Sequence, residues 1–361
     1  MKSIFDQMQM GPLLVKNRLI RSATAEMKCD GEGRITAGYK DIFSSLAKGG
    51  VGLIITGMFA VDENAGFGER TPNTYNDTFV GELQKLADLV HAHDCKIVVQ
   101  LVHCGAKAMQ AQGSSQPMGP SAITLPHARP ARAMTISEIK DVEESFAKAA
   151  AKCKEAGADG VQIHGAHGYL ISQFLSPSCN KRSDAYGGEI ANRGRIVIEM
   201  LDAMRREVGA TYPIWIKVNC KDLVEESITL AECIWLCVEM EKHGLSAIEL
   251  SAGMGHGRDS SPSKRITSED DEGSFAPEAI ALAEKVGIPV ISTGGFRSPA
   301  LIDMWLNKGG IEAIGLSRPL ICEPDLVNRW AFRDKEKARC VSCSKCYRPA
   351  AGYGCQVFPS A

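Results

Sequence analysis

Short apolar segments rich in Val and Ile recur along the whole chain, and most of them end in Gly, Ser or His. Near-continuous apolar segments of this length are typical of strands that are buried on both faces of a parallel sheet. The pattern predicts strands over residues 17–24, 50–58, 96–103, 159–166, 213–220, 246–253, 288–295 and 312–319.

Segments with apolar residues at three- and four-residue spacing lie between these strands and predict amphipathic helices. In one of them, Thr135 and Glu138 match a capping box and Gly157 matches a C-terminal cap. Helices are predicted over residues 36–49, 78–93, 138–157, 192–209, 229–244, 276–287, 298–310 and 323–337.

Strict alternation of strands and helices favours a parallel sheet with crossover helices, and eight repeats favour closure into a (β/α)₈ TIM barrel. A doubly wound sheet is disfavoured because no G-x-G-x-x-G turn follows the first strand. We predict a barrel over 1–337, a long Gly/Pro-rich loop at the barrel mouth over 104–137, and a short Cys-rich C-terminal extension over 338–361.

Composition restricts the class of protein. The chain has 361 residues, is 44% hydrophobic and carries a formal net charge of -2, so we expect no nucleic acid or membrane surface as partner. The N-terminus lacks an apolar signal core, and most of the 13 cysteines stand alone, which favours a reducing cytoplasm. We expect a small-molecule substrate; a homo-oligomer and a redox partner protein stay open.

Polar residues at the carboxyl ends of barrel strands face the mouth. The stretch "HGAHGYLISQFL" places His164, His167 and Tyr169 at the end of the fourth strand. Two histidines at this spacing could also bind zinc with His103 or His256 as a third ligand, and Tyr169 could merely pack.

The last two strands end in "STGG" and "LSRP", where barrels commonly bind phosphate. Gly294 and Gly295 allow close approach of the backbone to an anion, and Arg318 adds a positive charge. Gln100 could both donate to and accept from the amide edge of a flavin, while Lys217 could hold negative charge on the reduced ring.

Taken together, "NRLIRSAT" at 17–24, "GPSAI" at 119–123, "HGAHGYLISQFLSP" at 164–177, "NKRSDAYGG" at 180–188 and "NRGR" at 192–195 resemble the Old Yellow Enzyme family. These proteins are FMN-dependent ene-reductases that use NADH or NADPH. The resemblance runs from residue 1 to about 335 and is nearest to the branch that contains the barrel domain of bacterial 2,4-dienoyl-CoA reductase.

The resemblance implies a role for each matching residue. His164 and His167 would donate hydrogen bonds to the substrate, and Tyr169 would protonate Cα after hydride transfer from the flavin to Cβ. His256 would lie in a loop that contacts the substrate. The FMN-binding residues would be Ser22, Ala23, Thr24, Gly57, Gln100, His164, Lys217, Gly294, Gly295, Ser317 and Arg318.

Three positions depart from the family's pattern. Ala25 stands where several relatives carry Cys or Thr, and Met27 stands where some carry a second tyrosine. "HCGAKA" at 103–108 replaces the usual Gly-Arg pair, so we expect one positive charge fewer at the mouth.

The C-terminal extension holds Cys340, Cys343, Cys346 and Cys355, a spacing typical of a metal site. A similar set in the dienoyl-CoA reductase branch holds a [4Fe–4S] cluster, although the third gap here is one residue shorter. Three interpretations stay open: a [4Fe–4S] cluster, a structural zinc, or a segment that binds nothing.

Two other classes of function stay open. The chain could be an electron-transfer component whose Cys-ligated cluster exchanges electrons with a partner protein, and we would expect such a relay to need a separate donor. It could also be a barrel lyase that uses Lys217 as a Schiff-base amine.

Overall fold

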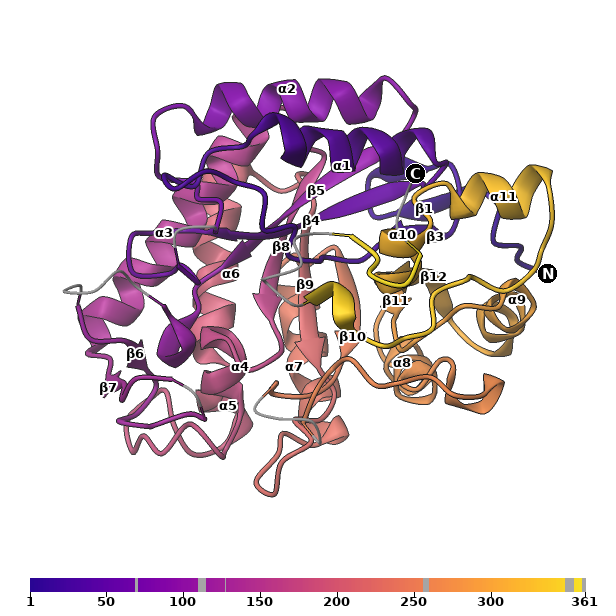
Figure 1. Ribbon diagram of the computed structural model, residues 1–361. Coiled ribbons are helices and arrows are strands. Elements are labelled where there is room, and N and C mark those ends of the chain that lie inside the picture. Colours follow the sequence, from indigo (N-terminus) through magenta and orange to yellow (C-terminus); the bar gives the residue numbers. More distant parts are fainter. Residues whose placement is uncertain (69–70, 110–114, 127, 256–259, 348–353, 359–361) are drawn as a thin grey trace.

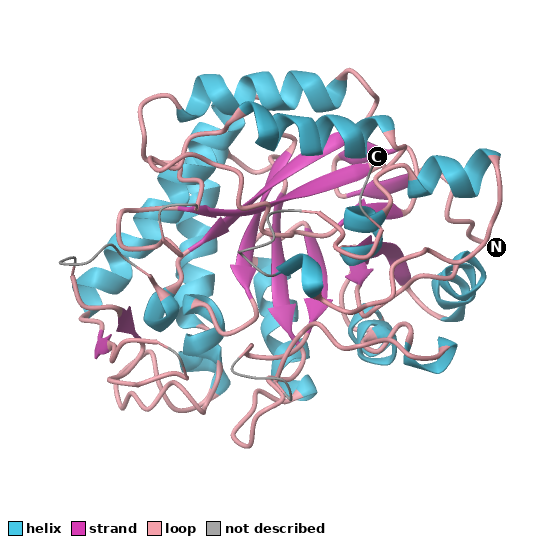
Figure 2. Ribbon diagram, in the orientation of Figure 1, coloured by secondary structure: helices cyan, strands magenta, loops and turns pink. Residues whose placement is uncertain are grey.

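A closed barrel of eight parallel strands forms the centre of the molecule, in the order β10-β11-β12-β3-β4-β5-β8-β9 (Figure 2). The computed structural model describes residues 1–68, 71–109, 115–126, 128–255, 260–347 and 354–358. The strands are β3 (Leu19–Arg21), β4 (Leu53–Ala60), β5 (Lys96–Val102), β8 (Gly160–Gly165), β9 (Ile214–Asn219), β10 (Ala247–Ser251), β11 (Val290–Ser292) and β12 (Ile311–Leu316). Each strand falls within or overlaps a predicted apolar segment, and the predicted TIM barrel is confirmed.

One long helix separates each strand from the next, and these helices enclose the barrel (Figure 1). The predicted capping box is present, because the Thr135 hydroxyl accepts the N–H of Glu138 while the Glu138 carboxylate accepts the N–H of Thr135. The helices are α1 (Ala37–Lys48), α2 (Phe79–His91), α3 (Ile136–Glu155), α6 (Arg195–Val208), α7 (Leu230–Lys242), α8 (Ala276–Ala283), α9 (Pro299–Lys308) and, after the last strand, α11 (Leu326–Phe332).

Shorter elements occupy the loops that follow the strands and build up the mouth. The loop after β5 contains the 3₁₀ turn η1 (Gly105–Lys107) and the small sheet β6 (Met118–Gly119) with β7 (Arg132–Ala133). Further elements are α4 (Leu170–Leu175) and α5 (Ile190–Arg193) after β8, η2 (Glu269–Asp271) after β10, α10 (Arg318–Cys322) after β12, and η3 (Lys345–Tyr347) near the C-terminus.

An N-terminal hairpin, β1 (Met8–Met10) with β2 (Leu13–Val15), closes the opposite end of the barrel. Met8, Met10 and Val15 pack against barrel side chains that include the fully buried Trp215. Burying an aliphatic side chain of this size stabilises the fold by about 1.5–3 kcal/mol. The hairpin therefore covers this end of the barrel.

No helix within the described residues is long and apolar enough to cross a membrane.

Candidate active site

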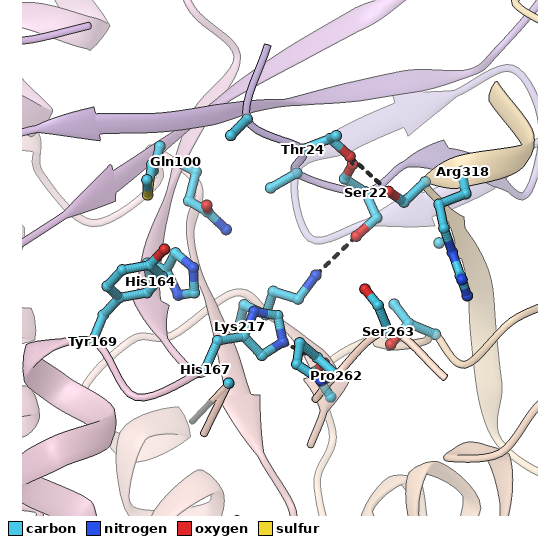
Figure 3. A pocket seen from close by; sticks show the side chains of 18 of the residues that line it. Ser22, Thr24, Gln100, His164, His167, Tyr169, Lys217, Pro262, Ser263 and Arg318 are labelled. Atoms are coloured by element: carbon cyan, nitrogen blue, oxygen red, sulfur yellow. Dashed lines mark hydrogen bonds between the residues drawn. The ribbon is translucent and has the colours of Figure 1, made fainter. Parts of the chain in front are cut away.

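A cavity of about 650 Å³ opens at the carboxyl ends of the barrel strands (Figure 3). This volume is in the range of cofactor-binding sites. No Asp or Glu among the described residues lines it, whereas five basic side chains do: Lys107, Arg129, Lys217, Arg297 and Arg318. A cavity with charges of one sign favours ligands of the opposite sign, so this one is suited to anions.

His164, His167 and Tyr169 share one end of the cavity. His164 lies in β8, and the other two belong to the turn that leads into α4. The His164 ring centroid lies 5.4 Å from that of His167 and 4.7 Å from that of Tyr169. Figure 3 shows the phenol and the His164 imidazole beside each other, facing the space below Gln100.

Burial sets the protonation of these three groups. It lowers the pKa of both imidazoles well below the ordinary value, and the nearby Lys217 charge lowers it further. Both rings are therefore neutral at pH 7. The Ala166 N–H donates to Nδ1 of His164 at 3.4 Å, which leaves Nε2 as the protonated nitrogen. Burial also raises the pKa of the Tyr169 hydroxyl, so the phenol retains its proton.

The turn after β8 is held in an uncommon backbone conformation. His167 has φ 59° and Gly168 has φ 73°. A non-glycine residue in this left-handed region costs about 1–3 kcal/mol and persists only when its surroundings fix it. Here Asn219 Oδ1 accepts the N–H of His167 at 3.3 Å, and the His167 Nε2 lies 2.8 Å from Ser251 Oγ. The turn thus directs the imidazole toward β10.

A hydrogen-bonded network forms the floor of the cavity. Lys217 Nζ donates to Ser22 Oγ at 2.8 Å and to Glu249 Oε1 at 2.9 Å. Glu249 Oε2 accepts from Gln162 Nε2 at 2.8 Å, and Gln162 Oε1 accepts from Gln100 Nε2 at 2.8 Å. Four of the five residues come from different barrel strands, and Ser22 follows β3 directly.

Gln162 and Glu249 were missed in the sequence, although a signal exists. Each lies two residues before a residue of the mouth, His164 and Ser251, and side chains in a strand alternate between its faces. A polar residue at that spacing inside an apolar segment points to a second polar layer below the first. Both side chains are fully buried.

The opposite end of the cavity is suited to a phosphate. Gly294 has φ 126° and Gly295 has φ 83°, and no acceptor in the described chain takes a hydrogen bond from either N–H group. A Cβ atom on Gly295 would approach Ile266 Cδ1 to 2.3 Å. Arg318 also lines the cavity, and Ser317 Oγ lies 2.8 Å from Thr24 Oγ1.

Most of the predicted site residues line this one cavity: Ser22, Ala23, Thr24, Gln100, His164, His167, Tyr169, Lys217, Gly294, Gly295, Ser317 and Arg318. Gly57 does not line it. Its N–H donates to the buried Glu26 carboxylate at 3.2 Å, and its neighbour Met58 lines the cavity instead. His256 falls outside the described residues.

We expected one positive charge fewer at the mouth, and this expectation is wrong. Lys107, which belongs to the same "HCGAKA" segment, lines the cavity. Its Nζ donates to the carbonyl of His167 at 2.8 Å and to that of Met254, and it lies 5.4 Å from the Tyr169 ring centroid. Burial lowers the pKa of Lys107 to about 8.

The C-terminal Cys segment contacts the cavity wall through its backbone. Burial raises the pKa of Cys322 at the end of α10, and the neighbouring Cys355 and Cys340 thiols raise it further. Arg318 Nη1 donates to the carbonyl of Ser342 at 3.1 Å, and Arg297 Nη1 donates to that of Cys340 at 3.2 Å. Cys340 is buried while Cys343 is exposed. Within the described ranges, no group of three or more His, Cys, Asp or Glu side chains is arranged to hold a metal ion. At the mouth, Nδ1 of His103 accepts the N–H of Gly105 at 3.0 Å, and His256, the other candidate third zinc ligand, falls outside the described residues.

Comparison with known proteins gives a consistent result. The model of the NADH:flavin oxidoreductase / NADH oxidase family matches residues 3–335. A metal reductase from Desulforamulus reducens is 34% identical over 354 residues, which is 96% of this chain and 51% of that protein. An NADPH dehydrogenase from a Geobacillus species is 32% identical over 313 residues, covering 86% of this chain and 88% of the relative.

Solved structures with the same fold include a 2-naphthoyl-CoA reductase in complex with 2-naphthoyl-CoA, with a TM-score of 0.89 and 27% identity. That similarity covers 99% of this chain and 57% of the other. Morphinone reductase in complex with tetrahydroNAD has a TM-score of 0.80 at 23% identity over 99% of this chain and 96% of that one. The chain spans about half the length of the first curated relatives, 51% and 53%.

Proposed function

The chain belongs to the NADH:flavin oxidoreductase / NADH oxidase family, and we propose that it is an FMN-dependent enzyme that takes hydride from NADH or NADPH and reduces an activated C=C bond. One observation carries the proposal. Two neutral imidazoles and a protonated phenol face a cavity that has a lysine in its floor and two unbonded backbone N–H groups at its far end.

The cavity residues fit FMN. The N–H groups of Gly294 and Gly295, with the Arg318 guanidinium, would hold the phosphate. Arg318 uses three N–H bonds on Ser342, Ser344 and Lys264, which leaves part of its five-donor guanidinium for the ligand. Gln100 and Lys217 would face the ring. Bound there, FMN supplies the redox chemistry, because it can take a hydride from NAD(P)H and pass it on.

The mouth residues would act on the substrate. His164 and His167 donate hydrogen bonds to the carbonyl oxygen of an enone or enoyl compound, which draws electron density from the alkene. Tyr169 donates its proton to Cα, while the hydride goes to Cβ. A buried phenol is suited to this step, because its raised pKa keeps the proton until carbanion character develops beside it.

A visible spectrum followed by two anaerobic half-reactions tests the proposal. The purified chain should bind FMN, and NADH or NADPH should bleach the flavin absorption. Adding 2-cyclohexenone should then restore it with formation of the saturated ketone. A chain that binds no FMN, or one whose reduced form is reoxidised by oxygen but by no activated alkene, contradicts it.

A second candidate is an electron-transfer component that serves a partner protein. The observation that favours it is the contact of Arg318 with Ser342, which joins the Cys segment to the cavity end. Such a component would oxidise NADH and NADPH only very slowly on its own, which the same half-reactions measure. The lyase alternative has less support, since the Lys217 amine is bonded to Glu249 and Ser22.

A further inference from the structure

We propose that Glu249 is a positioning residue, which sets both the amide orientation of Gln100 and the net charge beneath the flavin. Glu249 is fully buried and does not line the cavity, so it acts through its neighbours rather than on the ligand. The inference rests on the proposed function only in assuming that the cavity holds FMN.

The amide orientations follow from the carboxylate, because an ionised carboxylate can only accept hydrogen bonds. The group of Gln162 that faces Glu249 Oε2 must therefore be its NH₂, and the contact measures 2.8 Å. This turns the Gln162 carbonyl toward Gln100, whose NH₂ donates to it at 2.8 Å. A single acceptor in β10 thus determines two side-chain orientations in β8 and β5.

The orientation of the Gln100 amide gives the cavity one hydrogen-bond acceptor and one donor side by side. Gln100 uses one of its two Nε2–H bonds on Gln162, so its carbonyl oxygen and its second N–H are left for a ligand. Gln100 lines the cavity. An adjacent acceptor and donor match an imide edge, in which N–H stands next to C=O, and the pyrimidine part of the flavin ring has such an edge.

The same carboxylate neutralises the floor. Lys217 Nζ lies 2.9 Å from Glu249 Oε1, and the side chains are 6% and 0% exposed. Ser22 Oγ donates to the same Oε1 atom and accepts from Lys217. An ammonium has three N–H bonds, so one is left to point into the cavity. The ring would therefore meet a directed N–H from an ion pair, not an uncompensated cation.

Two substitutions separate the two effects. Glu249→Gln removes the charge and keeps the size of the side chain. An uncompensated Lys217 then favours reduced FMN. We expect the midpoint potential to rise by at least about 30 mV, which is a tenfold change in the equilibrium constant of a two-electron reduction. Gln162→Leu breaks the amide relay without changing a charge. The Kd for FMN should then rise at least tenfold, while the midpoint potential changes by less than a threefold change in the equilibrium constant for reduction would give.

The measurements are FMN titration by fluorescence and anaerobic redox titration of the holoenzyme. If Glu249→Gln does not fold, Glu249→Asp replaces it: the shortened side chain keeps its charge but cannot span to Gln162, so Kd should rise tenfold with little change of potential. A wild-type potential in Glu249→Gln together with a wild-type Kd in Gln162→Leu overturns the inference. With Glu249→Asp in place of Glu249→Gln, wild-type affinity in both remaining variants overturns it. Failure of the proposed function would give a different result, because the wild-type chain itself would then bind no FMN.

Discussion

The barrel mouth and the C-terminal Cys segment (residues 338–361, described over 338–347 and 354–358) both gather side chains suited to chemistry, but they are held in different ways. In the mouth, Lys217, Glu249 and Gln162 come from neighbouring strands, and each is bonded to the next. In the Cys segment, the described contacts to the barrel include those of the backbone of Cys340 and Ser342, the hydroxyl of Ser344 and the ion pair of Arg339 with Glu323, and none of these uses a thiol of Cys340 or Cys343. The mouth is therefore organised by hydrogen bonds between barrel strands, whereas the described contacts of the Cys segment leave its chemistry open.

The proposed function places the chemistry in the mouth, and the largest effect is expected from a substitution there. Tyr169→Phe removes the hydroxyl that we propose as the proton donor and little else, since the ring remains beside His164. We expect the alkene half-reaction to slow by about 10²–10⁴-fold, the usual contribution of a general acid. Stopped-flow measurement should show flavin reduction by NAD(P)H within threefold of the wild type. Equal loss in both half-reactions would mean that Tyr169 organises the site and is not a proton donor.

Arg318 belongs to both regions and makes the next largest difference. It lines the cavity and donates to Ser342 O and Ser344 Oγ. A hydrogen bond to a charged group contributes about 1.5–3 kcal/mol, so Arg318→Met should raise the Kd for FMN by about 10–150-fold. Riboflavin, which lacks the phosphate, should bind both forms equally. The control is Arg333→Met, because Arg333 pairs with Asp325 on the surface; it should leave both affinities unchanged.

The sequence predicts the mouth well because its residues lie at positions fixed by strand periodicity. His164 and Lys217 end apolar segments and are register partners in the barrel. Glu249 was missed, because a carboxylate inside a strand gives no sign of its partner until the register places it beside Lys217. Lys107 was missed for a different reason. The loop over 104–137 has no periodicity, and nothing local indicates that its ammonium reaches the carbonyls of His167 and Met254.

The N-terminal hairpin was also missed, and the cause is length. Strands of three residues, such as Met8–Met10, are too short to show an alternation. The Cys segment is the reverse case: its spacing was recognised, but the positions of its thiols do not follow from strand or helix periodicity.

Lys107 gives a smaller, pH-dependent effect inside the mouth. Burial lowers its pKa to about 8 in the folded protein, against about 10.4 for an exposed lysine. Between these values the unfolded chain binds more protons than the folded one, so the contribution of Lys107 to stability rises with pH from about 8 to about 10. Lys107→Met should lack this rise. Urea denaturation at pH 7.5 and pH 10 measures the difference between the two proteins.

Lys308→Met is the control for that experiment, because Lys308 lies over the Trp305 ring on the surface helix α9. It should keep the wild-type dependence on pH. An unchanged pH profile in Lys107→Met would show that the ammonium is as accessible as an ordinary surface lysine.

The smallest effect on flavin chemistry is expected from the Cys segment. Cys343 is exposed and is not among the residues lining the cavity, so Cys343→Ser should leave both half-reactions within twofold of the wild type. Iron and zinc analysis of the anaerobically purified proteins then gives an independent readout. Metal that is present in the wild type and lost in Cys343→Ser, with flavin turnover intact, would show that the two regions act separately. If Cys343→Ser loses alkene reduction together with its metal, the two regions are coupled. The thiolate would then have to act on the mouth through Ser342 and Arg318.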